Sequence, residues 1–217
     1  MSSILRAMAA VRQIPNILRP SLLKKNIKVL RLAFVWMSMR GAILKHNGLS
    51  EKPAVFFDRD GVLNVDNGYT FQKEDFVWVD GVKEAIKLLN DLDYYVFVIT
   101  NQSGVARGYY TEDDVIKLHA WMNEELKKSG AMIDGFYYCP HLPEAFIEKY
   151  RIDCQCRKPS PGMILRAMNE WPIDKGKSFL IGDSVRDVEA AEKAGIKGHL
   201  FQGDNLLSSI KQLLKTK

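Results

Sequence analysis

A short apolar run that ends in two carboxylates constrains this chain more than any other feature. Residues 54–57, Ala-Val-Phe-Phe, are followed directly by Asp58, Arg59, Asp60 and Gly61. Such a run predicts a buried strand of a parallel sheet, and ligands bind beyond the carboxyl ends of these strands. Residues two apart on a strand share a face, so Asp58 and Asp60 would lie close together. Adjacent carboxylates repel unless a cation or a shared proton relieves them. The pair therefore predicts a bound metal, a nucleophile beside an acid/base group, or both.

Apolar strands and amphipathic helices alternate along the chain from residue 53 onward. The expected strands cover residues 54–57, 94–100, 178–181 and 199–201. The expected helices cover residues 82–92, 111–130, 160–171, 187–195 and 204–215. Strands that alternate with helices at this spacing predict an α/β fold, in which helices cover both faces of a parallel sheet.

The charge of the chain is unevenly distributed. The 217 residues carry a net charge of +5, with 31 basic and 26 acidic residues. Residues 1–50 hold nine of the basic residues and no acidic one, which leaves 22 against 26, a net charge of −4, for residues 51–217. An acidic body argues against a nucleic-acid partner. We therefore divide the chain into a basic extension, residues 1–50, and one domain of catalytic size, residues 51–217.

Several interpretations of the extension, residues 1–50, stay open. Its apolar segment at residues 32–37 is too short to span a bilayer. The composition is compatible with an amphipathic helix on an anionic membrane surface, with a transit peptide, and with a loosely ordered appendage or an early gene start. No secretory signal is evident and the three cysteines are an odd number, so we expect a reducing, cytoplasmic setting. We expect the protein to be a monomer.

Three expected strands end in polar or reactive residues. Asp58 and Asp60 follow the first, Thr100 and Asn101 end the second, and Asp183 follows the third. In a parallel sheet these ends lie along one edge, so residues 125 positions apart can surround one ligand. Each residue alone also has an ordinary interpretation, since Thr100 can cap a turn and Asp183 can cap a helix. The coincidence of all three strand ends favours a common site.

With Arg157 and Lys158 added, these segments resemble the haloacid dehalogenase (HAD) superfamily of phosphohydrolases that use an aspartate nucleophile. Its four motifs occur here in order, as DRDGVLN (58–64), VITN (98–101), RKP (157–159) and GDSVRD (182–187). The resemblance implies a Rossmann-like fold, an aspartyl-phosphate intermediate and a catalytic magnesium ion.

The resemblance also implies a role for each motif residue. Asp58 would attack phosphorus, and Asp60 would protonate the leaving alkoxide and then deprotonate the attacking water. Magnesium would be held by the carboxylates of Asp58 and Asp183 and by the main-chain carbonyl of Asp60. Asp187 would support the site or cap its helix. The phosphoryl oxygens would be stabilised by Thr100, Asn101 and Lys158. Arg157, a further catalytic candidate, would offer a fork of donors to a second substrate anion.

A second cluster combines three cysteines and one histidine within eighteen residues. Cys139 and His141 are followed by Cys154 and Cys156. Three sulfurs and one imidazole supply the four ligands of a closed, structural zinc site. The alternative is three separate thiols with His141 in a turn. Since Cys156 directly precedes the two cations of the RKP motif, a zinc ion here would fix the position of both.

Within the superfamily, the chain is similar to the D-glycero-D-manno-heptose 1,7-bisphosphate 7-phosphatase family, which serves bacterial heptose precursor synthesis. The similarity covers about residues 53–195 and rests on FFDRDGVLN, DNGY, TNQSGVARG, GFYYCPHLP and CQCRKPSPGM. It implies a minimal cap with a zinc-stapled loop. Substrate contacts are implied for Asp66, Asn67, Gly68, Tyr69, Thr100, Asn101, Gln102, Ser103, Arg157 and Lys158. A plain Asp-Asn-Gly turn is the alternative for residues 66–69.

Three other functions stay open from the sequence alone. Histidinol-phosphate phosphatase shares the ancestry and the zinc-loop pattern, but its substrate needs a carboxylate or an aromatic wall, whereas a sugar needs hydroxyl partners. Polynucleotide 3′-phosphatase shares the motifs but should carry a basic groove. A non-catalytic, zinc-stabilised adaptor would have no need of the aspartates. The sequence favours a small sugar bisphosphate as the partner and leaves a membrane-surface contact of residues 1–50 undecided.

Overall fold

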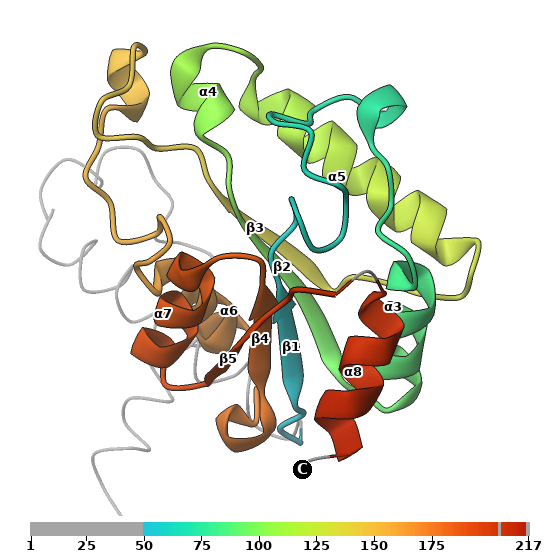
Figure 1. The fold of residues 1–217 in the computed structure, drawn as a ribbon. Coiled ribbons are helices and arrows are strands. Elements are labelled where there is room, and N and C mark those ends of the chain that lie inside the picture. The colour runs from blue at the N-terminus through green and yellow to red at the C-terminus, as the bar shows by residue number, and fades with distance from the viewer. Residues whose placement is uncertain (1–49, 204, 216–217) are drawn as a thin grey trace, which may run out of the picture. The chain divides into compact units, whose positions relative to one another are not determined.

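Five parallel strands form the centre of the computed structural model, which describes residues 50–203 and 205–215 (Figure 1). The strands are β1 (Ala54–Phe57), β2 (Tyr95–Asn101), β3 (Gly135–Cys139), β4 (Phe179–Gly182) and β5 (Lys197–Leu200). Their order across the sheet is β3-β2-β1-β4-β5, and each neighbouring pair is parallel. The strand that ends in the two aspartates therefore lies at the centre. The interpretations of the extension concern residues outside the described ones, apart from residue 50.

Helices cover both faces of the sheet, which confirms the predicted fold class. They are α3 (Val82–Asp91), α4 (Ser103–Arg107), α5 (Glu112–Lys127), α6 (Gly162–Glu170), α7 (Val185–Ala194) and α8 (Leu206–Lys215). Short 3-10 turns are η2 (Lys73–Asp75), η3 (Glu148–Tyr150) and η4 (Lys175–Lys177). Figure 1 shows α6 and α7 on one face and α3 and α8 on the other. In residues 50–203 and 205–215, no helix is both long enough and apolar enough to traverse a bilayer.

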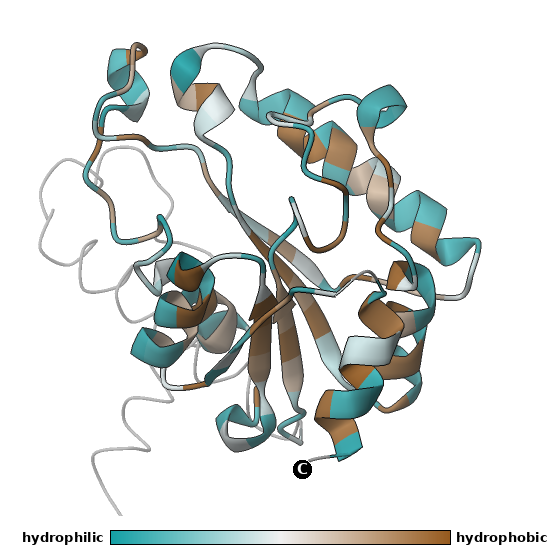
Figure 2. Cartoon of the chain, viewed as in Figure 1, coloured by the Kyte–Doolittle hydropathy of each residue, from teal (hydrophilic) through white to brown (hydrophobic). Residues whose placement is uncertain are grey.

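The side chains of β1 alternate between two hydrophobic cores. Ala54 and Phe56 pack into a cluster with residues of α6 and α7, whereas Val55 and Phe57 pack into a cluster with residues of α3, α5 and α8. All four side chains are fully buried. A strand covered on both faces needs apolar residues at every position, which is why this sequence is a continuous run rather than an alternating one. Figure 2 shows the same apolar character along the central strands.

One strand and one α-helix were not predicted from the sequence. The strand β3 has half-buried residues such as Phe136 and Tyr138 between its buried ones, so it lacks the continuous apolar run of the central strands. It lies at an edge of the sheet. The helix α4 has only five residues, among them Gly104, and a single helical turn leaves no periodic pattern. A capping box of Thr111 and Asp114 begins α5, at the position where the sequence predicted the start of a helix.

His119 of α5 is buried beneath the end of β1. Its ring stacks on Phe136 with the ring centroids 4.5 Å apart, and its Nε2 lies 3.5 Å from Arg59 Nη1. Burial and the positive charge of Arg59 hold the pKa of His119 well below its usual range. The folded protein therefore keeps this ring neutral at a pH where the unfolded chain protonates it.

We expect His119 to make the protein less stable in mild acid. An unfolded histidine has a pKa of about 6.5. Below that pH the unfolded state binds a proton that the folded state does not bind, so the free energy of unfolding decreases. Between pH 7.5 and 5.5 the free energy of unfolding should fall by about 1 kcal/mol more in the natural protein than in His119→Phe. Urea unfolding of both proteins at both pH values measures this difference. An equal fall in the two proteins would show that His119 is not held neutral.

Candidate active site

Asp58 stands directly after the central strand, almost completely buried. Its exposed fraction is 6%, and its Oδ1 lies 2.8 Å from Lys158 Nζ. The same oxygen accepts a hydrogen bond from the backbone N–H of Arg59 at 2.7 Å. Burial raises the pKa of Asp58 to about 6, although Lys158 acts in the opposite direction. An ionised carboxylate at this position therefore depends on positive charge beside it.

Lys158 is fixed at both ends of its side chain. Its Nζ lies 2.6 Å from Asp187 Oδ1 and donates to the carbonyl oxygen of Ile99 at 3.0 Å. Asp187 is fully buried, and its Oδ2 accepts from the backbone N–H of Ser184 at 3.0 Å. The Asn101 amide donates to the carbonyl of Lys158 at 3.1 Å and accepts from its N–H at 3.0 Å. The ammonium group consequently has one defined position, between two carboxylates.

Asp60 has a different set of partners. The guanidinium of Arg59, which is fully buried, donates from Nη2 to both carboxylate oxygens of Asp60 at 2.9 Å. Gln102 Nε2 donates to Oδ2 at 3.0 Å, and Asn64 Nδ2 donates to Oδ1 at 3.1 Å. Arg59 is itself held by the carbonyl oxygen of Thr70 at 2.7 Å. The two carboxylates of the motif are thus neutralised by different cations.

Three carboxylates meet where a metal ion would bind. Asp58, Asp183 and Asp187 each offer an oxygen, and these oxygens lie within 4.8 Å of one another. Gly61 has a φ of +82°, and a side chain there would collide with the Asp183 carboxylate, so glycine permits the close approach. A donor set made only of oxygens suits a hard divalent cation such as Mg²⁺. The Asp60 carboxylate is paired with Arg59, so Asp60 would contact a metal ion through its main-chain carbonyl oxygen.

A polar cavity of about 250 Å³ joins these groups at the carboxyl ends of β1, β2 and β4. It is lined by Asp58, Asp60, Asp66, Gly68, Tyr69, Thr100, Asn101, Gln102, Ser103, Tyr110, Arg157, Lys158, Asp183 and Arg186. Of the residues that the sequence suggested for the phosphate and the substrate, Asn67 lies outside this lining and is exposed. Tyr69 has a φ of +53° and packs edge-on against Tyr109, with the ring centroids 4.8 Å apart.

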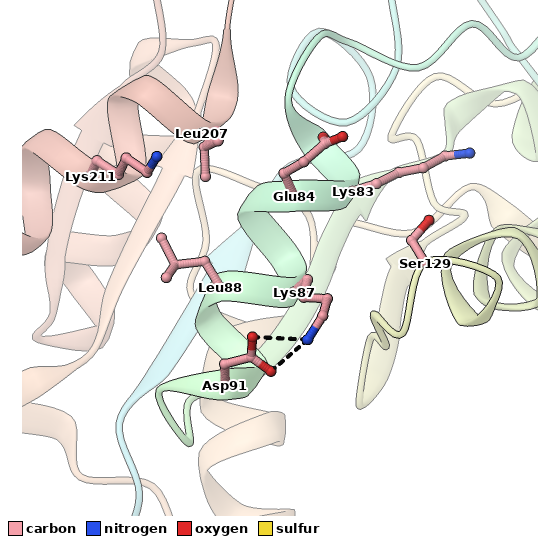
Figure 3. A pocket seen from close by; sticks show the side chains of 8 residues that line it. All are labelled: Lys83, Glu84, Lys87, Leu88, Asp91, Ser129, Leu207 and Lys211. Atoms are coloured by element: carbon pink, nitrogen blue, oxygen red, sulfur yellow. Dashed lines mark hydrogen bonds and ion pairs between the residues drawn. The ribbon is translucent and has the colours of Figure 1, made fainter.

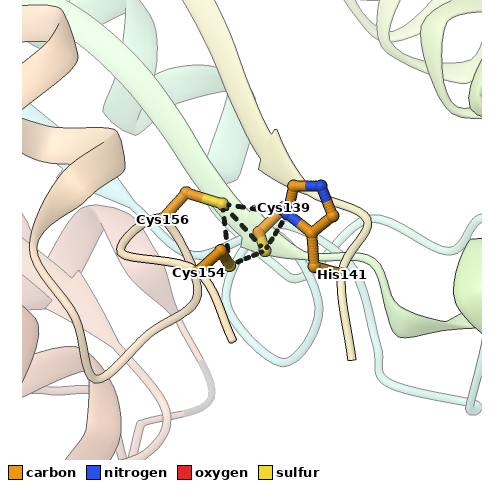
Figure 4. Close-up of side chains that lie close together, drawn as sticks. All are labelled: Cys139, His141, Cys154 and Cys156. Carbon is orange, nitrogen blue, oxygen red and sulfur yellow. Dashed lines mark hydrogen bonds between the residues drawn. The ribbon is translucent and has the colours of Figure 1, made fainter. Parts of the chain in front are cut away.

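The cysteines and the histidine converge beside this cavity (Figure 4). The sulfurs of Cys139, Cys154 and Cys156 lie 3.1 to 3.5 Å apart, and His141 Nδ1 lies 3.3 Å from the Cys156 sulfur. Tetrahedral zinc with its usual bond lengths spaces such ligands by roughly 3.5 to 3.8 Å. The observed spacings are slightly shorter, but all four donor atoms converge on one point, as a closed zinc site requires. Arg157 Nη1 donates to the carbonyl of His141 at 3.3 Å.

Comparison with known proteins identifies the family. A HAD-hydrolase-like family model matches residues 155–206. The crystal structure of a D,D-heptose 1,7-bisphosphate phosphatase from B. bronchiseptica, complexed with magnesium and phosphate, matches with a TM-score of 0.65 and 29% identity, over 76% of this chain and 99% of that one. A D-glycero-beta-D-manno-heptose-1,7-bisphosphate 7-phosphatase from Rhodopseudomonas palustris is 51% identical over 163 residues, 75% of this chain and 91% of the relative. The chain belongs to the heptose 1,7-bisphosphate 7-phosphatase family.

A further relative agrees with this assignment. The D-glycero-beta-D-manno-heptose-1,7-bisphosphate 7-phosphatase of Photorhabdus laumondii is 48% identical over 144 residues, which are 66% of this chain and 77% of the relative. The identity and coverage of the two relatives confirm the resemblance inferred from the motifs. The chain is a member of the HAD superfamily through this family.

Several residues of the heptose phosphatase site were not singled out from the sequence. Arg59 separates the two aspartates and holds one of them, and Arg186 lines the cavity from the first turn of α7. Tyr110 donates from its hydroxyl to Gln102 Oε1 at 2.8 Å. Gln102, suggested as a sugar contact, instead uses its amide N–H groups on Asp60 and on the Thr100 hydroxyl, the latter at 2.8 Å. The contact between Gln102 and Asp60 spans 42 positions, so spacing alone does not indicate it.

A second hollow, of about 290 Å³, lies on the outer side of α3 and α8 (Figure 3). It is lined by Lys83, Glu84, Lys87, Leu88, Asp91, Ser129, Leu207 and Lys211. Lys87 pairs with Asp91 one helical turn away, with Nζ 2.8 Å from Oδ1, and both side chains are exposed. This arrangement is that of an ordinary helix surface. No residue at the carboxyl ends of β1, β2 or β4 lines this second hollow.

We expect Asp187→Ala to lower the free energy of unfolding by about 3 kcal/mol, because a buried ammonium group loses one of its two carboxylates. Asp113→Ala is the matched control, since Asp113 also lies in the first turn of a helix and pairs with a lysine. Asp113 and Lys117 are 69% and 70% exposed, so that loss should stay below about 0.5 kcal/mol. Urea unfolding measures both, and equal losses would contradict a structural role for the buried pair.

Proposed function

We propose that the chain is a magnesium-dependent phosphatase that removes the C7 phosphate of D-glycero-D-manno-heptose 1,7-bisphosphate in bacterial heptose precursor synthesis. The observation that carries this proposal is Asp58, a buried carboxylate that faces a polar cavity and is held by Lys158 at 2.8 Å. Membership in the family supplies the substrate. The partner is then a small sugar bisphosphate. We further infer that residues 51–217 form the phosphatase domain and that it acts in the cytoplasm as a monomer.

Asp58 would act as the nucleophile. Its carboxylate oxygen forms a bond to phosphorus while the bond from phosphorus to the sugar oxygen breaks, which gives an aspartyl-phosphate and an alkoxide. Lys158 keeps the carboxylate ionised before the attack. The Thr100 hydroxyl accepts a hydrogen bond from Gln102, so its own hydrogen is available to a phosphoryl oxygen. Arg157, which also lines the cavity, would offer its fork of donors to the second phosphate of the substrate.

Asp60 would act as the general acid and then as the general base. It gives a proton to the leaving alkoxide and takes one from the water that hydrolyses the aspartyl-phosphate. Its three side-chain partners, Arg59, Asn64 and Gln102, fix the carboxylate in place. In this account Gln102 orients the acid rather than the sugar. Sugar hydroxyls would be bound by Asp66, Gly68, Tyr69 and Ser103, and a contact with Asn67 stays a prediction.

The two groups of donor atoms, carboxylate oxygens and the Cys/His cluster, indicate which metal ion each would bind. Magnesium would be held by the carboxylates of Asp58 and Asp183 and by the main-chain carbonyl of Asp60, and when bound it offsets the repulsion between an anionic nucleophile and an anionic phosphate. A structural zinc ion would be held by Cys139, His141, Cys154 and Cys156. The zinc site has no open position, so its role would be to fix the loop that carries the two cations of the RKP motif.

A comparison of substrates tests the proposal. The purified chain with magnesium should release phosphate from heptose 1,7-bisphosphate with a kcat/KM at least about a hundredfold above that for histidinol phosphate, because the polar lining offers hydroxyl partners. Asp58→Asn is the control for contaminating phosphatase, and it should abolish release while the circular dichroism spectrum is retained. A reversed preference would favour histidinol-phosphate phosphatase, and activity of Asp58→Asn would refute the nucleophile.

Removal of one sulfur tests the zinc site. Cys156→Ser should reduce bound zinc from about one ion per chain to a small fraction, because a hydroxyl is a poor zinc ligand. KM for the bisphosphate should rise more than kcat falls, since the neighbouring Arg157 loses its position while Asp58 and Asp60 keep theirs. Elemental analysis and steady-state kinetics measure these changes. Natural protein purified without bound zinc would refute the site.

A further inference from the structure

Arg186 lines the catalytic cavity and has no role in the chemistry described above. It lies in the first turn of α7, three residues after Asp183, and its side chain is exposed. Among residues 50–203 and 205–215 it makes no hydrogen bond or ion pair. Its guanidinium therefore brings five N–H donors to the cavity without a protein acceptor for them.

The cations of the cavity differ in how many donors they have left. An ammonium group has three N–H donors, and those of Lys158 are directed to Asp58, Asp187 and the carbonyl oxygen of Ile99. Arg157 uses one donor, on the carbonyl of His141. Arg157 and Arg186 consequently hold most of the unused positive donors around the cavity, and they come from two different elements, the Cys/His loop and α7.

A bisphosphate presents two anions, and the groups around Asp58 serve the one that reacts. The second phosphate would otherwise enter a cavity that already contains the carboxylates of Asp60, Asp66 and Asp183. It therefore needs its own cations, and the planar fork of a guanidinium binds phosphate through two parallel hydrogen bonds. We propose that Arg186, in addition to Arg157, binds the phosphate that is not removed and so increases the preference for bisphosphates over monophosphates. This inference rests on the proposed function.

The test compares two substrates on variants of the full chain. For Arg186→Gln, the ratio of kcat/KM for heptose 1,7-bisphosphate to that for heptose 7-phosphate should fall about tenfold or more, mainly through a higher KM for the bisphosphate. Arg186→Lys keeps the charge but loses the fork, so its ratio should be intermediate. Lys193→Gln is the matched control, because it removes the same charge from the last turn of the same helix, where Lys193 pairs with Glu189. Its ratio should equal that of the natural protein.

Each outcome decides between distinct conclusions. An unchanged ratio in Arg186→Gln overturns the inference, whether both activities are retained or both fall together. An equal fall on both substrates would place Arg186 with the reacting phosphate or with Asp183 instead. Failure of the natural protein to hydrolyse the bisphosphate would refute the proposed function, and it is seen before any variant is compared.

Discussion

The buried ammonium group of Lys158 is the interaction on which the site depends. A charge removed from water is stable only where it is fully paired, and here the partners are Asp58 after β1, Asp187 of α7 and the carbonyl of Ile99 in β2. These elements must therefore hold one mutual register, which the parallel sheet provides. The lysine itself arrives from the Cys/His loop, and Asn101 clamps its backbone. Sheet, helix and loop are joined at one atom.

The second carboxylate of the motif, Asp60, is neutralised by a different cation from the first, Asp58. Asp60 is turned to the guanidinium of Arg59, with Asn64 and Gln102 completing its hydrogen bonds. Two neighbouring carboxylates in different environments can take different parts in one reaction. One is bound to an ammonium group at the strand end and the other to a guanidinium, which suits the two different roles proposed for them.

The sequence predicted the parts of the structure that depend on residues close together in the chain. The run at residues 54–57 indicated a strand because a strand covered on both faces must be apolar throughout, and all four side chains are buried. The strand β3 was not predicted because its half-buried positions, Phe136 and Tyr138, carry aromatic residues, so the alternating burial does not show as alternating polar and apolar residues. The partners of Gln102 escaped it because its contact with Asp60 spans 42 positions. The burial of Arg59 could not be expected from composition, since a charged residue is ordinarily exposed.

Three successive residues of the Cys/His loop have three different roles. Cys156 belongs to the Cys/His cluster, Arg157 lines the cavity, and Lys158 is the buried partner of Asp58. Consecutive Cα atoms are about 3.8 Å apart, so a single inserted or deleted residue would displace one of these groups by that distance. We expect natural variation in loop length to be confined to the segment between His141 and Cys154. We expect Cys156, Arg157 and Lys158 to stay consecutive in related chains even where the rest of the loop differs.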